Sequence, residues 1–296
     1  MEPEKWAAEI KDVFLYCFIK LKGTEFMKKT MIALGIAISA VSGVAHAWTN
    51  GEFSGAVDIG GTVTPPPVSP WQWKMGAPIT GMDTSWDRLS ASNKVTFNMT
   101  TPKPLLMGKL ETPTIGGPGL APQVMWQDAK GQNININFSA TNNESSGSFS
   151  VPVMDGAGTS ELGTAVLKIH SYGLMAKANT ADNVGVNYQP LRGGVAGDVG
   201  FGMIPSQYNG IKQEANATLA AINSLAGEEI FTEAMKQGAT VKNQAASATF
   251  TSPLSKNTAA LVAGFESGDS IVVTFAQRPT STTKWKIPLS ATVTHQ

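Results

Sequence analysis

Apolar and polar residues alternate along the segment from residue 48 to residue 64, WTNGEFSGAVDIGGTVT. A period of two over this length predicts an extended strand with one face for burial. Three prolines follow the segment; they cannot donate to a strand ladder and they favour an extended polyproline conformation. Because no turn signal joins it to a later strand, we predict a donor strand that pairs with another copy of the chain. Its inward-facing apolar residues are Phe53, Val57, Ile59 and Val63.

Short alternating runs continue through the rest of the chain and, with the many glycines and prolines between them, predict an all-β protein. No strand is assigned to residues 101–119, which hold four prolines, or to residues 178–205, which are rich in Gly and Asn without a firm period. The predicted strands span residues 71–75, 94–100, 124–126, 134–138, 149–153, 163–172, 247–251, 259–265, 270–276 and 285–294.

The pattern changes to a helical one between residues 206 and 225, where apolar side chains recur at three- and four-residue steps. Ser206 is the predicted N-cap. A second short helix is predicted over residues 228–237, with Gly238 as the residue that ends it. Strands resume afterwards, so we predict a helix-containing insertion, at about residues 179–238, in a β-sandwich.

The last predicted strand has one apolar face and no later strand in the sequence to cover it. An immunoglobulin-like sandwich needs about seven strands. If the final one is absent, a hydrophobic groove stays open beside this strand, and such an edge promotes aggregation unless it is filled. We therefore predict an incomplete sandwich that is completed by donor-strand exchange. The residues on the apolar face are Ile287, Leu289, Ala291, Val293 and His295.

The N-terminal region has the pattern of a secretory signal peptide. Residues 27–47 combine a basic start, a short apolar run and an Ala-His-Ala cleavage site, and the run is too short to cross a membrane as a helix. Residues 1–26 are interpreted as a non-native upstream extension, with a long cytoplasmic leader as the alternative. The predicted divisions are the extension at 1–26, the signal peptide at 27–47, the donor strand at 48–64 and the sandwich at 65–296.

Composition narrows the possible functions. The 22 basic and 22 acidic residues balance, and no basic patch indicates a nucleic-acid partner. Cys17 is the only cysteine and precedes the predicted cleavage site, so packing alone must stabilise the exported protein. After that site the only histidines are His170 and His295, and no catalytic, metal-binding or nucleotide-binding motif occurs. We expect no enzyme, no cofactor and no metal site, and we interpret His170 as a structural residue of its strand.

Aromatic residues offer weak candidates for sugar binding, because an exposed ring can stack on the apolar face of a sugar. Core packing is the competing explanation, and we favour it for Trp73, Trp126 and Trp285, which lie in strand-like runs. For Trp71 and Trp86 the sequence does not favour core packing over sugar binding. The better candidates for glycan contacts flank the irregular region and are Tyr172, Tyr188 and Tyr208.

Several segments resemble a known family. The donor-strand segment followed by WQWK, the run PKPLLMGK, the strand GTAVLKIHSYG and the ending WKIPLSATVT are similar to FaeG-like fimbrial subunits of enterotoxigenic Escherichia coli, which belong to the kappa class of chaperone–usher pilins. The resemblance covers both ends and the first half of the exported chain. It fades between residues 179 and 238, so no glycan contact is transferred from the family.

This resemblance implies an incomplete immunoglobulin-like fold, a periplasmic chaperone, an outer-membrane usher and a surface fibre whose major subunit binds host glycans. One departure is the end of the chain, where the family usually has an aromatic residue and this sequence has His295 and Gln296. We predict a structural subunit of a surface adhesive fimbria, exported through the periplasm, that also binds host glycans. The alternatives are a minor non-adhesive subunit, a lectin-type adhesin whose fibre role is secondary, and a secreted enzyme.

Overall fold

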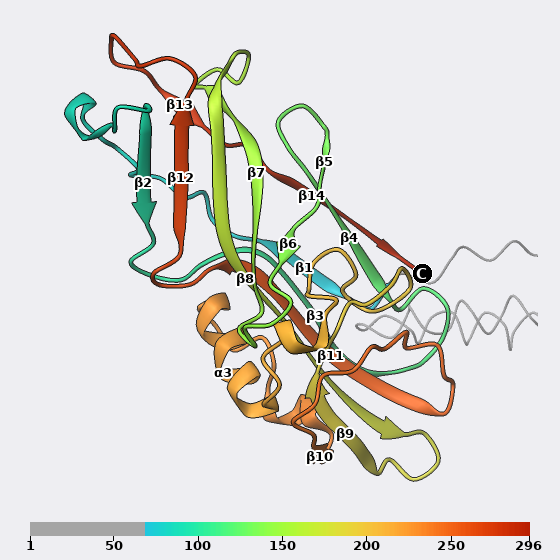
Figure 1. Cartoon of the computed structure of the whole chain (residues 1–296). Helices are drawn as coiled ribbons and strands as arrows, with labels where there is room; N and C mark the ends of the chain where they lie inside the picture. Colours follow the sequence, from blue (N-terminus) through green and yellow to red (C-terminus); the bar gives the residue numbers. More distant parts are fainter. Residues whose placement is uncertain (1–68) are drawn as a thin grey trace, which may run out of the picture. The chain divides into compact units, whose positions relative to one another are not determined.

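The longest strand, β8, organises the main sheet of the domain (Figure 1). The computed structural model describes residues 69–296, which lie within one compact unit. The predicted signal peptide and donor strand lie outside the described residues. The strands are β1 (Gln72–Met75), β2 (Lys94–Asn98), β3 (Lys103–Ile115), β4 (Pro122–Gln127), β5 (Asn133–Ile134), β6 (Asn137–Phe138), β7 (Ser146–Asp155), β8 (Glu161–Asn179), β9 (Gly185–Pro190), β10 (Thr240–Val241), β11 (Ser255–Phe265), β12 (Ser270–Phe275), β13 (Trp285–Lys286) and β14 (Ser290–His295). The helical segments are η1 (Trp86–Arg88), η2 (Tyr208–Gly210), α3 (Ala215–Ala226) and η3 (Glu233–Lys236).

Both edges of β8 are paired along most of its length. On one edge β12 pairs with residues 163–167 and β11 continues along residues 170–179, both antiparallel to β8. On the other edge β7 pairs with residues 161–170 and β9 with residues 174–178. Strands β3 and β1 extend the sheet beyond β11, and β2 extends it beyond β12. Two halves of one sheet therefore share β8 as their common strand.

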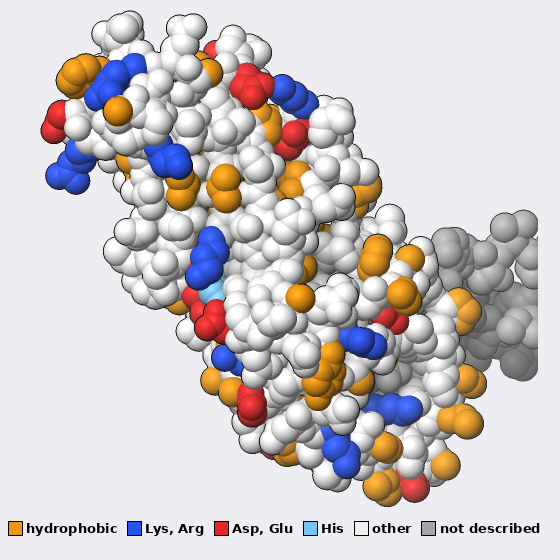
Figure 2. Space-filling model, in the orientation of Figure 1, with side chains coloured by type: hydrophobic (Ala, Val, Ile, Leu, Met, Phe, Trp, Pro, Cys, Tyr) orange, Lys and Arg blue, Asp and Glu red, His pale blue; other side chains and the backbone are white. Residues whose placement is uncertain are grey.

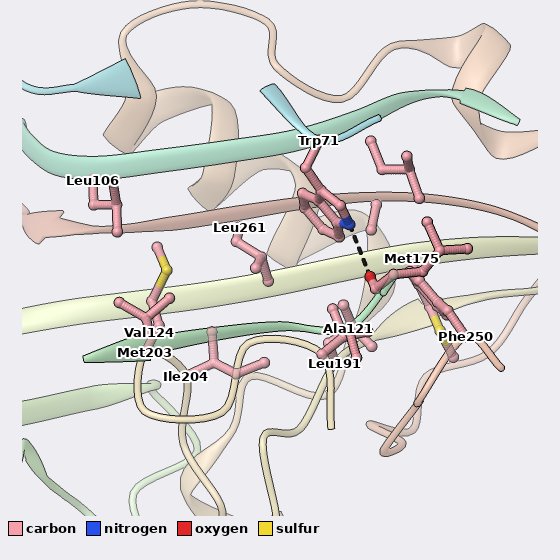
Figure 3. Packing of buried hydrophobic residues seen from close by; sticks show 14 of the residues in the cluster. Trp71, Leu106, Ala121, Val124, Met175, Leu191, Met203, Ile204, Phe250 and Leu261 are labelled. Atoms are coloured by element: carbon pink, nitrogen blue, oxygen red, sulfur yellow. Dashed lines mark hydrogen bonds between the residues drawn. The ribbon is translucent and has the colours of Figure 1, made fainter. Parts of the chain in front are cut away.

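A second sheet, with the order β14-β4-β5, forms the other layer of the sandwich. Val124 of β4 packs with Leu261 of β11 in one hydrophobic cluster (Figure 3). The same cluster includes Trp126 of β4. Trp71, which precedes β1, donates from its indole Nε1 to the carbonyl of Leu120 at 2.9 Å and ties the start of the domain to this cluster. The predicted all-β sandwich is confirmed.

Helix α3 covers the opposite face of the same half of the main sheet. Its buried residues include Ile222 and Leu225, which join Tyr188, Phe231 and Val262 in a second cluster. Because β8 and β11 are covered on both faces here, eight consecutive residues of β8, 169–176, are buried. A third cluster lies under β2, β7, β12 and the first half of β8.

The helical prediction was wrong about where the helix begins. The structure starts α3 at Ala215, not after Ser206. The helix ends at Ala226 and is capped by Gly227, whose φ of 70° is the left-handed conformation that glycine adopts readily. Residues 208–210 form a 3₁₀ turn, because the carbonyls of Asn209 and Gly210 accept hydrogen bonds from the loop that precedes β7. The second predicted helix is reduced to the 3₁₀ turn η3.

Two segments without a predicted strand form strands. Residues 101–119 contain the thirteen-residue β3, and residues 178–205 contain β9. Pro104 and Pro113 are tolerated in β3 because β1 pairs only with residues 106–109, so neither proline lies where β3 has a neighbour on both edges.

Three predicted strands differ in the structure. The run 285–294 is divided into β13, which pairs with β7 in the main sheet, and β14, which pairs with β4 in the second sheet, and residues 287–289 between them belong to no strand. The run 134–138 is split, because β5 pairs with β4 in one sheet and β6 pairs with β7 in the other. The run 247–251 forms no regular strand, and Phe250 within it has a φ of 53°, which interrupts an extended conformation.

Membrane insertion through a helix is not indicated by residues 69–296, since none of their helices is long and apolar enough to cross a bilayer.

Candidate functional site

Strand β14 is paired on one edge only in the described part of the chain. Its partner is β4, with the register running from Ser290 opposite Gln127 to His295 opposite Pro122. No strand among residues 69–296 pairs with its other edge. In Figure 1, β14 crosses β4 and runs to the C-terminal end of the chain.

The register also shows which backbone groups face this open edge. Ala121 and Gln296 exchange two backbone hydrogen bonds of 3.1 Å, so alternate residues of β14 make the same bonds to β4. The remaining residues, Ala291, Val293 and His295, direct their N–H and C=O groups away from β4. These groups can accept a further strand without any rearrangement of the sheet.

A groove of about 1470 Å³ lies beside the segment that leads into β14. One wall is formed by residues 75–86, between β1 and β2, and the other by residues 279–289. The floor is apolar and belongs partly to the third cluster. Residues of the floor are Leu105, Leu167, Phe265, Ile271 and Phe275.

The apolar face predicted for the last strand faces the sandwich but is incompletely covered. Ser290, Thr292 and Thr294 are exposed, whereas the residues of the opposite parity are only half-buried. The half-buried set, in chain order, is Ile287, Leu289, Ala291, Val293 and His295.

Sequence reasoning missed other half-buried residues that continue this face. Ile79 and Met82 pack against the third cluster from the first wall of the groove, and Ile134 and Ile136 contact both neighbouring clusters. Ile79 and Met82 lie in a segment with glycine and proline but without periodicity, so the sequence carried no signal for their role. Together these residues form a long apolar surface that the described chain leaves partly open.

His295 ends this face and carries a polar atom into it. Its Nε2 is buried and has no hydrogen-bond partner in the described residues, and burial lowers the pKa of its imidazole. The neutral ring is therefore favoured in the folded domain, which suits a residue at the end of an apolar face.

The three tyrosines proposed as glycan contacts differ in exposure. Tyr172 is buried and donates from its hydroxyl to Glu266 at 2.7 Å; burial first, and then this carboxylate, raise its pKa. Tyr188 is fully buried against Phe231, and its pKa is raised mainly by burial. Tyr208 in η2 is 38% exposed. Only Tyr208 therefore offers part of its ring to a surface ligand in this structure.

The tryptophans also differ in exposure. Trp71 and Trp126 are buried, and Trp73 stacks on Trp71 with ring centroids 5.5 Å apart. Trp285 is half-buried and packs on Phe97. Trp86 is 62% exposed, in contrast to the other four. Figure 2 shows apolar and basic side chains gathered at the end of the domain where β2 begins.

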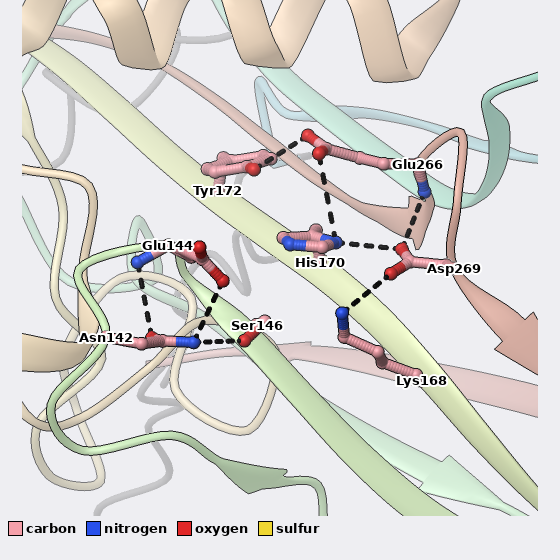
Figure 4. Close-up of polar contacts among 8 residues, drawn as sticks. All are labelled: Asn142, Glu144, Ser146, Lys168, His170, Tyr172, Glu266 and Asp269. Atoms are coloured by element: carbon pink, nitrogen blue, oxygen red, sulfur yellow. Dashed lines mark hydrogen bonds and ion pairs between the residues drawn. The ribbon is translucent and has the colours of Figure 1, made fainter.

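His170 is a structural residue, as predicted. It is buried, and its Nδ1 lies 2.8 Å from Oδ2 of Asp269 (Figure 4). The same carboxylate oxygen accepts from the backbone N–H of Glu266 at 2.8 Å, and its second oxygen lies 3.5 Å from Nζ of Lys168. This network holds the loop between β11 and β12 against β8. Within residues 69–296, no three His, Cys, Asp or Glu side chains are grouped so that they could hold a metal ion.

Comparison with known proteins gives one consistent result. The profile of the family described as "Fimbrial, major and minor subunit", of the K88 type, matches residues 27–296. K88 fimbrial protein AB of Escherichia coli is 28% identical over 286 residues, which cover 91% of this chain and 100% of the relative. K88 fimbrial protein AC of the same species is 29% identical over 287 residues, and protein AD is 26% identical over 285 residues, with the same coverage. The chain therefore belongs to the K88-type family of fimbrial major and minor subunits, the structural proteins of surface fimbriae.

Proposed function

We propose that this fimbrial subunit polymerises by donor-strand exchange, with residues 48–64 of one copy filling the groove beside β14 of the next. The observation that carries the proposal is the unpaired edge of β14 above a half-buried apolar face. Strand addition of this kind is the established assembly mode of chaperone–pilin systems. The side chains that would enter the groove are Phe53, Val57, Ile59 and Val63.

The magnitude of this interaction is sufficient for a stable fibre. Burying four such side chains at about 1.5–3 kcal/mol each gives roughly 6–12 kcal/mol before the cost of ordering the arm. Backbone hydrogen bonds to Ala291, Val293 and His295 add to this gain. Each copy has one arm and one groove, so the pairing is head-to-tail, does not close, and yields a filament.

The open groove also accounts for the proposed export partners. An uncovered strand edge with an apolar face aggregates readily. We propose that a periplasmic chaperone covers β14 after residues 27–47 have directed export, and that an outer-membrane usher replaces the chaperone with the arm of the next subunit. The fibre then extends from the cell surface.

The first test moves residues 48–64 behind a short linker after Gln296, so that the arm can fill the groove of its own chain. We expect a soluble monomer that no longer polymerises and that unfolds at a higher denaturant concentration than a chain with the arm removed. Size-exclusion chromatography and urea unfolding give the two readouts. A monomer whose stability does not depend on the arm would contradict the proposal.

Host-glycan binding is the second proposed activity, and the inserted region at about residues 179–238 is its proposed location. The exposure of Tyr208 favours this location, because a tyrosine ring can stack on the apolar face of a sugar. Adhesion would then reside in the repeated subunit itself. Alternatively the chain is a minor, non-adhesive subunit, or a lectin-type adhesin with a secondary fibre role; copy number on purified fimbriae separates a minor from a major subunit.

Replacing Tyr208 by alanine in the self-complemented monomer should reduce glycan binding by about tenfold, as expected for the loss of one stacking contact. A glycan array followed by titration of the strongest ligand measures the change. Tyr188→Phe is the matched control, because Tyr188 is buried and its hydroxyl only approaches the Ala215 carbonyl at 3.4 Å. Unchanged binding by the Tyr208→Ala protein would exclude this residue from the site.

A further inference from the structure

An exposed tryptophan held by an arginine lies at one end of the groove. The guanidinium carbon of Arg278 lies 4.2 Å from the ring centroid of Trp86. Arg278 also donates to the carbonyl of Trp86 at 2.9 Å, to that of Leu89 at 3.3 Å and to that of Ser90 at 3.2 Å. The arginine therefore fixes both the ring and the backbone that carries it. A large apolar ring held in place while it is 62% exposed is a typical anchor of a binding surface.

Trp86 belongs to the groove and not to a separate surface. It lines the same space as Ile79, Ile287 and Leu289, whose side chains form the apolar face beside the entry to β14. The opposite wall at this end consists of residues 279–286. A chain that leaves the groove on this side therefore passes close to residues that include Trp86.

The direction of the donor strand determines which part of a second copy arrives there. The pairings of the named strands are antiparallel except for β10 with β9, and antiparallel pairing is the more stable kind. A donor strand antiparallel to β14 begins near His295 and ends near Ile287. Its last inward residue, Val63, then lies at the Trp86 end of the groove.

The residues that follow Val63 are rich in proline, whose rings can pack on an exposed tryptophan such as Trp86. Pro65, Pro66 and Pro67 come next in the sequence, and Pro70 follows shortly after. Three residues beyond Val63 reach about 10 Å in an extended or polyproline conformation. Consecutive prolines in that conformation present flat apolar rings, and exposed aromatic side chains are the common receptors for them.

We propose that Trp86 is the docking site for the proline segment, residues 65–70, of the copy that donates its strand. This inference rests on the donor-strand exchange proposed above and adds a second contact between consecutive subunits. The contact clamps the arm where it leaves the groove and sets the position of the donating domain relative to the accepting one. Arg278 is the positioning residue that holds the ring ready.

Cysteine pairs in assembled fimbriae test this contact, since Cys17 is the only cysteine of the chain and precedes the predicted cleavage site. The combination of Pro66→Cys with Ser85→Cys places one thiol on the proline segment and the other beside Trp86. After mild oxidation we expect disulfide-linked multimers on non-reducing gels. Adding Trp86→Ala should lower the linked fraction by about fivefold, because the prolines lose their receptor. The matched control combines Pro66→Cys with Leu254→Cys, an exposed residue outside the groove, and should stay unlinked.

Two further pairs separate the possible failures. Val57→Cys with Ala291→Cys reports strand exchange itself, and Pro66→Cys with Gln296→Cys reports a strand inserted in the parallel direction. Linkage of the first pair without linkage of Pro66→Cys to Ser85→Cys would overturn the docking site and leave strand exchange intact. A link between residues 66 and 85 within a single copy, or one that Trp86→Ala does not reduce, would also overturn it. Absence of the Val57→Cys to Ala291→Cys link would instead contradict the proposed function.

Discussion

Replacing Ile59 by aspartate should abolish fibre assembly, whereas the same charge at Thr62 should leave assembly close to that of the unmodified chain. Ile59 has the parity that would face the groove, and Thr62 has the parity that would face solvent. The apolar face at this edge offers half-buried side chains such as Leu289 and Val293, and the two lysines that line the groove, Lys284 and Lys286, are exposed. The two variants add the same charge to the same arm, so composition and net charge are matched.

The expected size of the effect follows from two contributions. The Ile59→Asp variant loses the burial of one aliphatic side chain, about 1.5–3 kcal/mol, and must also desolvate an ionised carboxylate, which costs several kcal/mol more. Against a gross gain of roughly 6–12 kcal/mol for the whole arm, this removes most of the driving force. Electron microscopy of cells that express each variant, with quantification of sheared fimbriae, gives the readout.

Two outcomes would contradict the donor-strand proposal. Equal assembly of the Ile59→Asp and Thr62→Asp proteins would mean that the arm has no buried face, and the donor-strand proposal would fall. Deleting residues 48–64 is a second version of the test, in which fibres that still form would contradict the proposal. If the proposed periplasmic chaperone binds at β14, the subunit that lacks residues 48–64 should still be recovered in complex with it, because the groove itself is unchanged.

Strands with one covered face were the part of the fold that the sequence predicted best. The alternation of Ile287 to His295 correctly separated the half-buried residues from the exposed Ser290, Thr292 and Thr294. Strand β12 was predicted for the same reason, since its residues alternate between half-buried and buried. Period two is visible only where one face of a sheet is more accessible than the other.

Where both faces of the sheet are covered by other elements, the period-two pattern of apolar residues disappears. Strand β3 runs through Leu105, Leu106 and Met107, and α3 lies on one side of this half of the sheet while β4 lies on the other. Prolines and an unbroken apolar run therefore obscured a thirteen-residue strand. The expectation that Tyr172 and Tyr188 contact glycans was wrong for the same reason. The added helical layer buries rings that would otherwise be exposed on a sheet surface.

Only one of the two walls of the groove has a periodic pattern in the sequence. Part of one wall, the apolar residues Ile287 and Leu289 before β14, was predicted from parity, and the wall formed by residues 75–86 was not. That segment has no regular structure apart from the last residue of β1 and the first residue of η1, and its apolar residues Ile79 and Met82 follow no period. Only tertiary packing brings it opposite residues 279–289. A binding site made from one strand and one irregular segment is therefore half visible in a sequence.

Replacing Asp269 by alanine should destabilise the domain by about 3–5 kcal/mol, as expected when one partner of a buried charged network is removed. Asp269 is 2% exposed and accepts from the backbone N–H of Glu266 while its other contacts are His170 and Lys168. Without the carboxylate, a buried imidazole and a backbone N–H lose their partner. Urea unfolding of the self-complemented monomer measures the change.

Lys168→Ala is the matched control for this variant. Its side chain is half exposed and 3.5 Å from the carboxylate, so its loss should cost less than about 1 kcal/mol. Asp269→Asn should lie between the two, because the amide oxygen can still accept one hydrogen bond. Equal stability of the Asp269→Ala and Lys168→Ala variants would show that the network does not hold the loop.

The position of this network links stability to the groove. Strands β11 and β12 lie end to end along one edge of β8, and the loop between them carries Asp269 together with Glu266. Phe265, immediately before the loop, is buried in the third cluster and forms part of the groove floor. When Asp269 no longer anchors the loop, Phe265 loses the support that fixes its depth in the groove. The Asp269→Ala subunit should therefore bind a synthetic peptide of residues 48–64 more weakly even at temperatures where the domain remains folded, and the Lys168→Ala subunit should bind it normally.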